Sequence, residues 1–288
     1  MKRRTFVGGS ALAGFLAAMP LTRALAGTAA PGSPGAKTGP YDFRSYRETN
    51  RLCPVYNVTP DDGYYLHTFY DVCPWSPSQR YLACTKFPFQ DREPKYGEEA
   101  RICLIDMKDK TLTEVWSTRA WGFQLGSNVQ WGGTDRYLYF NDLVDGEAAC
   151  IRLDLETGKG EALAGPMYHV APDDSAVVSF PLDLINASQS GYGYAEDPAR
   201  ARSLKPGAAG DEGIWRTDLK TGEKTLIVSL AEAYEVLPDA DKKRFEGGTF
   251  YFFHSKYNPQ ATRILQVFRC MMPTAGTEFG IGGTGVFK

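Results

Sequence analysis

The three histidines are the first candidates for chemistry, because imidazole can take up and release a proton near neutral pH. His254 follows the apolar run Phe250–Phe253 and precedes a turn, and His67 has an analogous place before another turn. His169 stands at a third position of this kind, directly before Val170. We predict His254 and His67 as catalytic bases or acids. The alternative for each histidine is a hydrogen-bonded structural role between neighbouring elements.

Two polar segments rich in aromatic residues could recognise a sugar, because aromatic planes stack on sugar rings and amides donate hydrogen bonds. One runs over residues 119–131 and contains Arg119, Trp121, Gln124, Asn128 and Gln130. The other runs over residues 186–194 and contains Tyr192, a candidate proton donor. Arg216 is a candidate to bind a carboxylate of the substrate. Alternatively, it forms a surface ion pair with Asp218 or Glu212. Both segments also fit ordinary connecting loops.

The elements that must position these residues repeat along the chain. An aromatic or apolar residue, a polar turn that often contains proline, and an apolar strand recur from Trp75, Trp131, Val170 and Tyr257. Between these copies lies a second motif, in which an apolar strand ends in aspartate and a polar turn and strand follow. Its copies end at Asp106, Asp154 and Asp218.

Two alternating hairpins make a four-stranded unit, and repeats of about 40–50 residues with four strands are typical of β-propeller blades. We therefore predict an all-β chain of about four to five blades over residues 42–270. A β-sandwich does not alternate the same two hairpins in fixed order. The clear motifs end near Arg269, which predicts an incomplete seven-bladed ring, truncated or frameshifted; a closed ring of four or five blades is the alternative. One helical stretch, residues 230–245, is interrupted by Pro238.

The two ends of the chain lack these motifs. Residues 1–26 combine Arg3-Arg4, an apolar stretch and Ala24-Leu25-Ala26, which indicate a twin-arginine signal peptide and a periplasmic or secreted protein. Residues 27–41 have the composition of a flexible linker, and residues 271–288 that of an irregular glycine-rich tail. The apolar stretch is too short for a stable membrane span, so none is expected in the mature chain.

Charge and cysteine content exclude further classes. The 288 residues carry 32 basic and 34 acidic side chains, a formal net charge of −2, which argues against a nucleic-acid partner. None of the six cysteines forms a C-x-x-C pair. Cys84, Cys103 and Cys150 lie in apolar runs and are expected as buried thiols, whereas a Cys53–Cys73 bridge is an open alternative.

The motifs resemble two known families. The Trp75-Ser76-Pro77 turn with Arg80-Tyr81-Leu82-Ala83 is similar to the repeat of TolB-type propellers. The stretch from His254 to Asn258-Pro259 resembles the oligogalacturonate lyase family, seven-bladed propellers that cleave uronic-acid-containing oligosaccharides by β-elimination. That family holds a divalent metal with histidines of later blades, and its His-Glu-Gly-Pro-Trp type segment is lacking after Arg269. We therefore assign no metal ligands and leave the cofactor undetermined.

The resemblance implies roles for the candidate residues. His254 and His67 would supply the base or acid, and Tyr192 a proton for the leaving oxygen. Contacts to an acidic oligosaccharide would come from a separate set: Arg119, Trp121, Gln124, Asn128, Gln130, Arg216 and Asn258. Whether the chain is an enzyme stays open at this point. The alternatives are a non-catalytic TolB-like propeller that binds a protein or a glycan, and an inactive fragment.

Overall fold

The computed structural model describes residues 23–24, 37–46, 52–273 and 282–287. Nearly all regular structure in these ranges is β-strand. The first strands are β1 (Arg23–Ala24), β2 (Arg44–Ser45), β3 (Tyr56–Asn57), β4 (Tyr64–Leu66), β5 (Tyr81–Phe87), β6 (Ala100–Asp106), β7 (Thr111–Thr118), β8 (Gln130–Trp131) and β9 (Tyr137–Val144). Then follow β10 (Glu147–Asp154), β11 (Lys159–Ala162), β12 (His169–Val170), β13 (Ala176–Ser179), β14 (Gly213–Asp218), β15 (Lys224–Ser229), β16 (Thr249–Tyr257), β17 (Ile264–Met272) and β18 (Gly282–Phe287).

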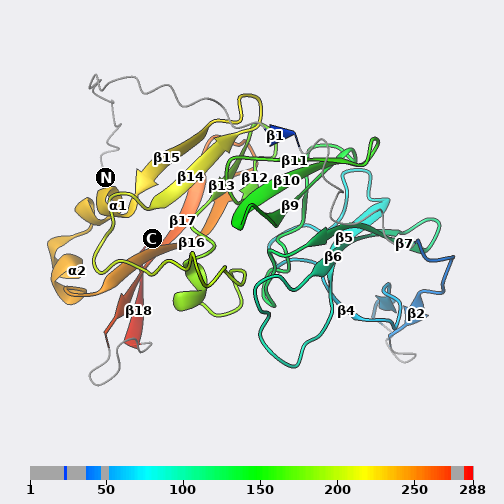
Figure 1. The fold of residues 1–288 in the computed structure, drawn as a ribbon, viewed down its shortest axis with the longest axis horizontal. Coiled ribbons are helices and arrows are strands. Elements are labelled where there is room, and N and C mark those ends of the chain that lie inside the picture. Colours follow the sequence, from blue (N-terminus) through cyan, green and yellow to red (C-terminus); the bar gives the residue numbers. More distant parts are fainter. Residues whose placement is uncertain (1–22, 25–36, 47–51, 274–281, 288) are drawn as a thin grey trace.

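The strands form antiparallel sheets that succeed one another along the chain (Figure 1). The sheet orders are β4-β5-β6-β7, β8-β9-β10-β11 with β1 added beside β11, β12-β13-β14-β15, and β16-β17-β18; β2 and β3 form a small ribbon. The sheets run from β4–β7 at one end of the molecule to β16–β18 at the other. These antiparallel sheets, three of which contain four consecutive strands, confirm the predicted all-β chain and have the organisation of propeller blades.

The first strands of the second, third and fourth sheets lie side by side. Strand β12 contacts both β8 and β16. The hydroxyl of Thr68, which follows β4, donates a hydrogen bond of 2.8 Å to the carbonyl of Val129, just before β8. The indole N–H of Trp131 donates to the carbonyl of Pro74 at 2.9 Å. Residues far apart in the sequence therefore meet beside these strands.

Both predicted hairpin motifs form. The first gives pairs such as Trp131 with Leu138 and Val170 with Val177 across the turn. In the second, the terminal aspartate accepts two backbone N–H bonds in its turn: Asp106 from Lys108 and Asp109, at 2.9 and 3.0 Å. The same geometry recurs at Asp154 and Asp218.

An arginine joins the two motifs. Arg80 bonds the second oxygen of Asp106 at 2.7 Å, and Arg136 bonds that of Asp154 at 2.8 Å. The third unit has Ser175 where the others have arginine, and Arg216 of β14 bonds Asp218 instead, at 3.2 Å. The repeated Arg and Asp thus stabilise the corner where two hairpins of one sheet meet.

We expect Asp106→Ala to lower the melting temperature more than Arg80→Ala does. The first change leaves two backbone N–H groups of the turn without their acceptor, whereas the second removes only a partly exposed ion pair. Thermal unfolding followed by circular dichroism measures both. An equal or larger loss for Arg80→Ala would mean that the ion pair, and not the turn, sets the stability of this corner.

Apolar side chains are buried between successive sheets. Ile102, Leu138, Phe140 and Ile151 form one such cluster at the first and second sheets. A larger cluster, which includes Phe180, joins the third sheet, the fourth sheet and the long connection before β14. Cys84, Cys103 and Cys150 are buried free thiols, as predicted, and burial raises the pKa of Cys150. Cys53 and Cys73 are exposed and free.

The predicted helical stretch consists of two short helices, α1 (Leu230–Glu235) and α2 (Asp239–Arg244). Ser229 and Glu232 form a reciprocal capping box that starts α1, and Pro238 precedes α2. A 3₁₀ turn, η1 (Ile185–Ala187), lies in the connection before β14. None of the helices in the described part of the chain is long and apolar enough to cross a membrane.

The ends of the chain are described only in part. Most of the predicted signal peptide and linker falls outside the described residues; Arg23–Ala24 pair with β11 as β1. Within the tail expected to be irregular, Gly282–Phe287 instead form β18 beside β17. This glycine-rich segment pairs with the preceding strand through backbone hydrogen bonds. Its composition did not indicate a strand, because glycine is uncommon inside strands.

Candidate functional site

A cleft of about 610 Å³ opens beside the β16–β17 hairpin and the segment that follows β4. His254 and Lys256 of β16 form part of its wall, and Asp71, in the segment after β4, forms another part. The remaining lining is Tyr70, Tyr257, Asn258, Arg263, Ile264, Leu265 and Val267. The cleft thus combines an imidazole, a carboxylate and two basic groups.

His254 occupies an irregular point of its strand. The β16–β17 register shifts between Phe253 and Lys256, and His254 has φ of 61°, in the left-handed region that histidine seldom adopts. Such backbone is held only where the surroundings enforce it, often at functional sites. Here a hydrogen bond of 2.5 Å joins the His254 Nδ1 atom to the Tyr168 hydroxyl. The bulge turns the imidazole out of the regular strand alternation and toward its partner.

Burial determines the charge state of this pair. Loss of solvation lowers the pKa of His254 to about 4, so its ring is neutral at neutral pH. Burial also raises the pKa of Tyr168, which therefore keeps its proton. The pair admits two proton arrangements: either Tyr168 donates to Nδ1, or Nδ1–H donates to the phenol oxygen and leaves the Nε2 lone pair free. The first arrangement presents an acid at Nε2, and the second presents a base.

Aromatic rings enclose His254. Phe69 stacks on the imidazole at 5.6 Å between ring centroids, and Tyr192 approaches it edge-on at 6.3 Å. Tyr192 also packs edge-on against Phe253 at 4.7 Å. Burial raises the pKa of Tyr192, so its hydroxyl stays protonated at neutral pH and can serve as a donor. The predicted candidates His254 and Tyr192 therefore come together, although only His254 is among the residues that line the cleft.

Positive charge lies beside the pair. The Lys256 ammonium forms an ion pair of 2.7 Å with Asp71, and its side chain is only 15% exposed. Loss of solvation lowers the pKa of Lys256, and Asp71 opposes that shift. The Arg269 guanidinium lies 4.5 Å from the centroid of Phe253, and its Nε atom is buried without a hydrogen-bond partner among the described residues. An anion bound here would gain attraction from these groups.

A groove of about 880 Å³ adjoins the cleft, and Asp71 lines both. It runs along the turns that begin the first three sheets, with Trp75, Gln130, Trp131 and His169 among its lining. The Nδ1 atom of His169 accepts a hydrogen bond of 3.2 Å from the backbone N–H of Tyr257. Burial lowers the pKa of His169 to about 4.

These two histidines make stability depend on pH. Each takes up a proton near pH 6.5 when unfolded but only near pH 4 when folded, so the unfolded state binds more protons between these values. We expect the melting temperature to fall as the pH is lowered through this window. Replacing both histidines with asparagine should flatten the profile measured by calorimetry between pH 7 and pH 4; an unchanged slope would assign the loss to carboxylates.

Asn128 and Gln130 hold the backbone of Tyr168. Both are buried, and their amides donate to the Tyr168 carbonyl at 2.8 and 2.7 Å. Asn128 also donates to the Met167 carbonyl at 2.9 Å. Their side-chain amide groups are thus engaged with the protein, and they position the residue that bonds His254.

The other predicted residues of the first segment lie elsewhere. Trp121 is 1% exposed, stacks on Phe87 and donates its indole N–H to the Glu98 carbonyl at 2.8 Å, so it belongs to the core. Arg119 is exposed and donates to the Leu143 carbonyl at 3.2 Å. Gln124 is exposed, and its backbone N–H bonds the Gly191 carbonyl at 3.0 Å.

That last bond shows that the two predicted recognition segments touch. A Cβ at Gly122 would lie 2.3 Å from the Gly193 carbonyl oxygen, so the close approach requires glycine at this position. Gln124 consequently lies beside the loop that carries Tyr192.

Two further candidates have local partners, and a third lies away from the cleft. Asn258 accepts backbone N–H bonds from Thr262 and Arg263, at 2.9 and 2.8 Å, and so shapes the turn that carries Arg263 to the cleft. Arg216 bonds Asp218, which is the ion pair given above as the alternative to a carboxylate-binding role. His67 is exposed and lines neither the cleft nor the groove as the structure describes them.

Sequence reasoning did not single out Tyr168, Asp71, Lys256 or Arg263. A signal existed for two of them: Tyr168 directly precedes His169 at the start of a hairpin motif, and Lys256 follows His254 by two residues. Asp71 carries no local signal, because its relation to Lys256 arises only when the first and fourth sheets meet.

The donor set does not fit a metal. No group of three His, Cys, Asp or Glu side chains able to hold an ion occurs among the residues described. His254 and His169 each use Nδ1 in a protein hydrogen bond, and His67 lines neither hollow. The chemistry that follows therefore uses no metal ligand set.

Comparison with family models and with curated protein sequences finds no match. Among solved structures, an oligogalacturonate lyase in complex with manganese is similar over 84% of this chain and 72% of its own, with 13% identity and a TM-score of 0.48. TolB from Acinetobacter baumannii is similar over 83% and 46%, with 13% identity and a TM-score of 0.42. The isopeptidase AtxE2 is similar over 78% of this chain and 38% of its own, with 13% identity and a TM-score of 0.34. The first two carry the names of the families that the motifs resemble; at these scores the similarity does not extend to an activity.

Proposed function

We propose that this chain is an exported propeller protein that cleaves uronic-acid-containing oligosaccharides by β-elimination, as a carbon–oxygen lyase. The observation that carries the proposal is the neutral imidazole of His254, bonded to Tyr168 in a cleft that also presents Lys256 and Arg263. A base beside positive charge is what removal of a proton next to a carboxylate requires.

The proposed reaction proceeds as a proton transfer with loss of an alkoxide. The Nε2 atom of His254, with its Nδ1–H donating to Tyr168, takes the proton alpha to the uronate carboxylate. The electron pair of that C–H bond forms a carbon–carbon double bond, and the C–O bond at the β position breaks. Tyr192 protonates the departing oxygen. Lys256 and Arg263 neutralise the carboxylate, whose negative charge grows as the proton leaves.

Substrate binding would adjust the base. An anion that enters the cleft stabilises the imidazolium form and raises the pKa of His254 from its value of about 4. The carboxylate must also compete with Asp71 for Lys256, since these two groups form an ion pair at 2.7 Å. The substrate thus supplies the charge that makes its own base stronger.

The direct test is an assay of the purified full-length chain with galacturonate oligomers, followed by the ultraviolet absorbance of the conjugated double bond in the product. We expect turnover in the wild type. In Lys256→Met, we expect KM to rise about tenfold or more, because a partly buried charge partner of the carboxylate is lost. Turnover with an unchanged KM in Lys256→Met would place the carboxylate elsewhere, and absence of turnover on all uronate oligomers would overturn the lyase proposal.

A second candidate function is binding without catalysis of a glycan or a protein. It is favoured by two exposed aromatic side chains beside the cleft and groove, since Tyr70 is 79% exposed and Trp75 is 40% exposed. Such rings are typical contact groups for sugars and for protein partners. Calorimetric binding of uronate oligomers with no product would support this function over the lyase.

A further inference from the structure

A second pair of cavities lies away from the cleft, beneath the connection from β13 to β14. This connection spans residues 180–212, whereas β9 and β10 of the second sheet are joined by Asp145 and Gly146 alone. Long connections with little secondary structure are uncommon in compact proteins and usually serve binding or catalysis. The connection also carries Tyr192 of the histidine site, but no residue that lines these cavities lines the histidine cleft.

The connection is held in place at several points. The Asn186 side chain bonds the Tyr194 carbonyl at 3.1 Å and the Gly193 N–H at 2.9 Å. Gly207 pairs with the fourth sheet: its N–H donates to the Gly248 carbonyl at 3.0 Å, and its carbonyl accepts from Phe250 at 2.9 Å. The walls of the space beneath it are therefore preformed.

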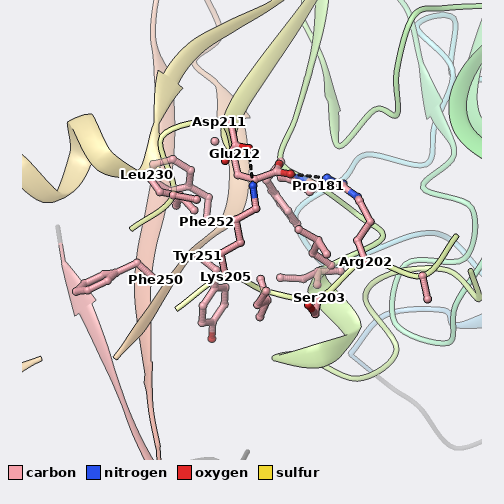
Figure 2. Close-up of a pocket in the computed structure, with 17 residues that line it drawn as sticks. Pro181, Arg202, Ser203, Lys205, Asp211, Glu212, Leu230, Phe250, Tyr251 and Phe252 are labelled. Atoms are coloured by element: carbon pink, nitrogen blue, oxygen red, sulfur yellow. Dashed lines mark hydrogen bonds and ion pairs between the residues drawn. The ribbon is translucent and has the colours of Figure 1, made fainter. Parts of the chain in front are cut away.

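The first cavity is an apolar chamber of about 400 Å³, a size typical of small-molecule sites. Its walls include Leu184, Leu204, Leu230, Phe250 and Phe252. Figure 2 shows Leu230 and Phe252 on one side and Arg202 on the other, with Lys205 reaching to Asp211. Charged pairs thus stand at the border of an otherwise apolar space.

The second cavity, of about 510 Å³, adjoins this chamber and shares Phe180, Pro181, Arg202, Asp211 and Glu212 with it. Carboxylates exceed cations in its lining. The acidic side chains are Glu147, Asp183, Glu196, Asp197, Asp211 and Glu212, and the basic ones are Arg200, Arg202 and Lys224.

The internal ion pairs compensate only part of this excess. Arg200 lies 3.6 Å from Glu147, and Lys205 bonds Asp211. Arg202 bonds both Asp183, at 2.6 Å, and Glu212, so one guanidinium serves two carboxylates. Glu196 accepts a backbone N–H bond from Arg202 at 3.1 Å, and burial raises its pKa, with Asp183 adding to the shift. Lys224 lies over the ring of Trp215 at 4.7 Å. An added cation would relieve the repulsion among the acidic groups.

We propose that these joined cavities bind a small amphipathic cation, an organic ammonium whose apolar part occupies the chamber and whose charge lies among the carboxylates. The apolar walls exclude a hydrated metal ion from the chamber, and the acidic excess disfavours an anion of the same shape. The site is separate from the histidine cleft and does not depend on the lyase proposal.

Three probes of matched size test the proposal: phenethylamine, phenethyl alcohol and phenylpropionate, titrated against the full chain by calorimetry. We expect phenethylamine to bind about tenfold more tightly than the alcohol, and phenylpropionate to bind least. Glu196→Gln keeps the shape and should reduce the preference for the amine over the alcohol. Glu156→Gln, on the exposed turn after β10, is the control and should leave all three affinities unchanged.

A second variant tests the chamber itself. Leu204→Trp should fill it and abolish binding of both the amine and the alcohol, provided that circular dichroism shows a wild-type spectrum. If this variant does not fold, Glu196→Gln still decides the charge part of the proposal. Equal affinity for the three probes, or an amine preference that survives Glu196→Gln, would overturn it.

Discussion

Replacing His254 with asparagine is expected to lower kcat/KM for uronate oligomers by about 10²- to 10⁴-fold, the usual contribution of a general base. Asparagine suits this position because it adopts positive φ more readily than most residues, and His254 has φ of 61°. The fold should therefore persist while the Nε2 base is lost. Steady-state kinetics, with the melting temperature as a check of folding, measure the effect.

Two companion variants make this result specific. His67→Asn should keep the wild-type rate, because His67 is exposed and lines neither hollow in the described structure. Tyr168→Phe removes the partner of Nδ1 and should shift the acidic limb of the pH–rate profile as well as the rate, since Tyr168 acts through His254. A rate loss in His67→Asn equal to that in His254→Asn would contradict the structural assignment of the base.

Replacing Asn128 with alanine is expected to lower the free energy of unfolding by about 3 kcal/mol. The change removes buried hydrogen bonds of 2.9 and 2.8 Å to the Met167 and Tyr168 carbonyls. It also places alanine at φ of 62°, where a Cβ is strained. Each carbonyl keeps a second donor, Asn141 or Gln130, and this limits the loss. Denaturant unfolding measures it.

Asn128→Gly separates the two causes. Glycine loses the same hydrogen bonds but tolerates the positive φ, so it should be about 1 kcal/mol more stable than the alanine variant. Both variants should also reduce turnover, because Tyr168 loses one of its two carbonyl supports. A glycine variant no more stable than the alanine variant would show that backbone strain is not part of the effect.

Much of the fold could be predicted because its signals are local. The turn residues of each hairpin, the aspartate that accepts two N–H bonds, and the arginine that pairs with it all lie within one sheet. Pro238 separates the two helices because its ring lacks a backbone N–H and prevents the first helix from continuing. Periodicity could not reveal β18, because its pairing depends on a neighbour rather than on apolar alternation.

The candidate site was predicted only in part, and the reason is side-chain direction. The aromatic and amide composition of residues 119–131 suggested sugar contacts, but the backbone directs Trp121 into the core and the amides of Asn128 and Gln130 toward Tyr168. Residue type indicates what chemistry a side chain can do. Which face it occupies depends on how neighbouring sheets pack.

The sequence by itself determined the repeating hairpins, the buried cysteines and the candidacy of His254 and Tyr192. Tertiary structure alone decided that Tyr168 bonds His254, that Asp71 pairs with Lys256, and that the β13–β14 connection covers two cavities. These partners belong to different parts of the chain, and the first strands β8, β12 and β16 of successive sheets contact one another. The free energy that joins them comes from packing between sheets, which no local pattern of residues encodes.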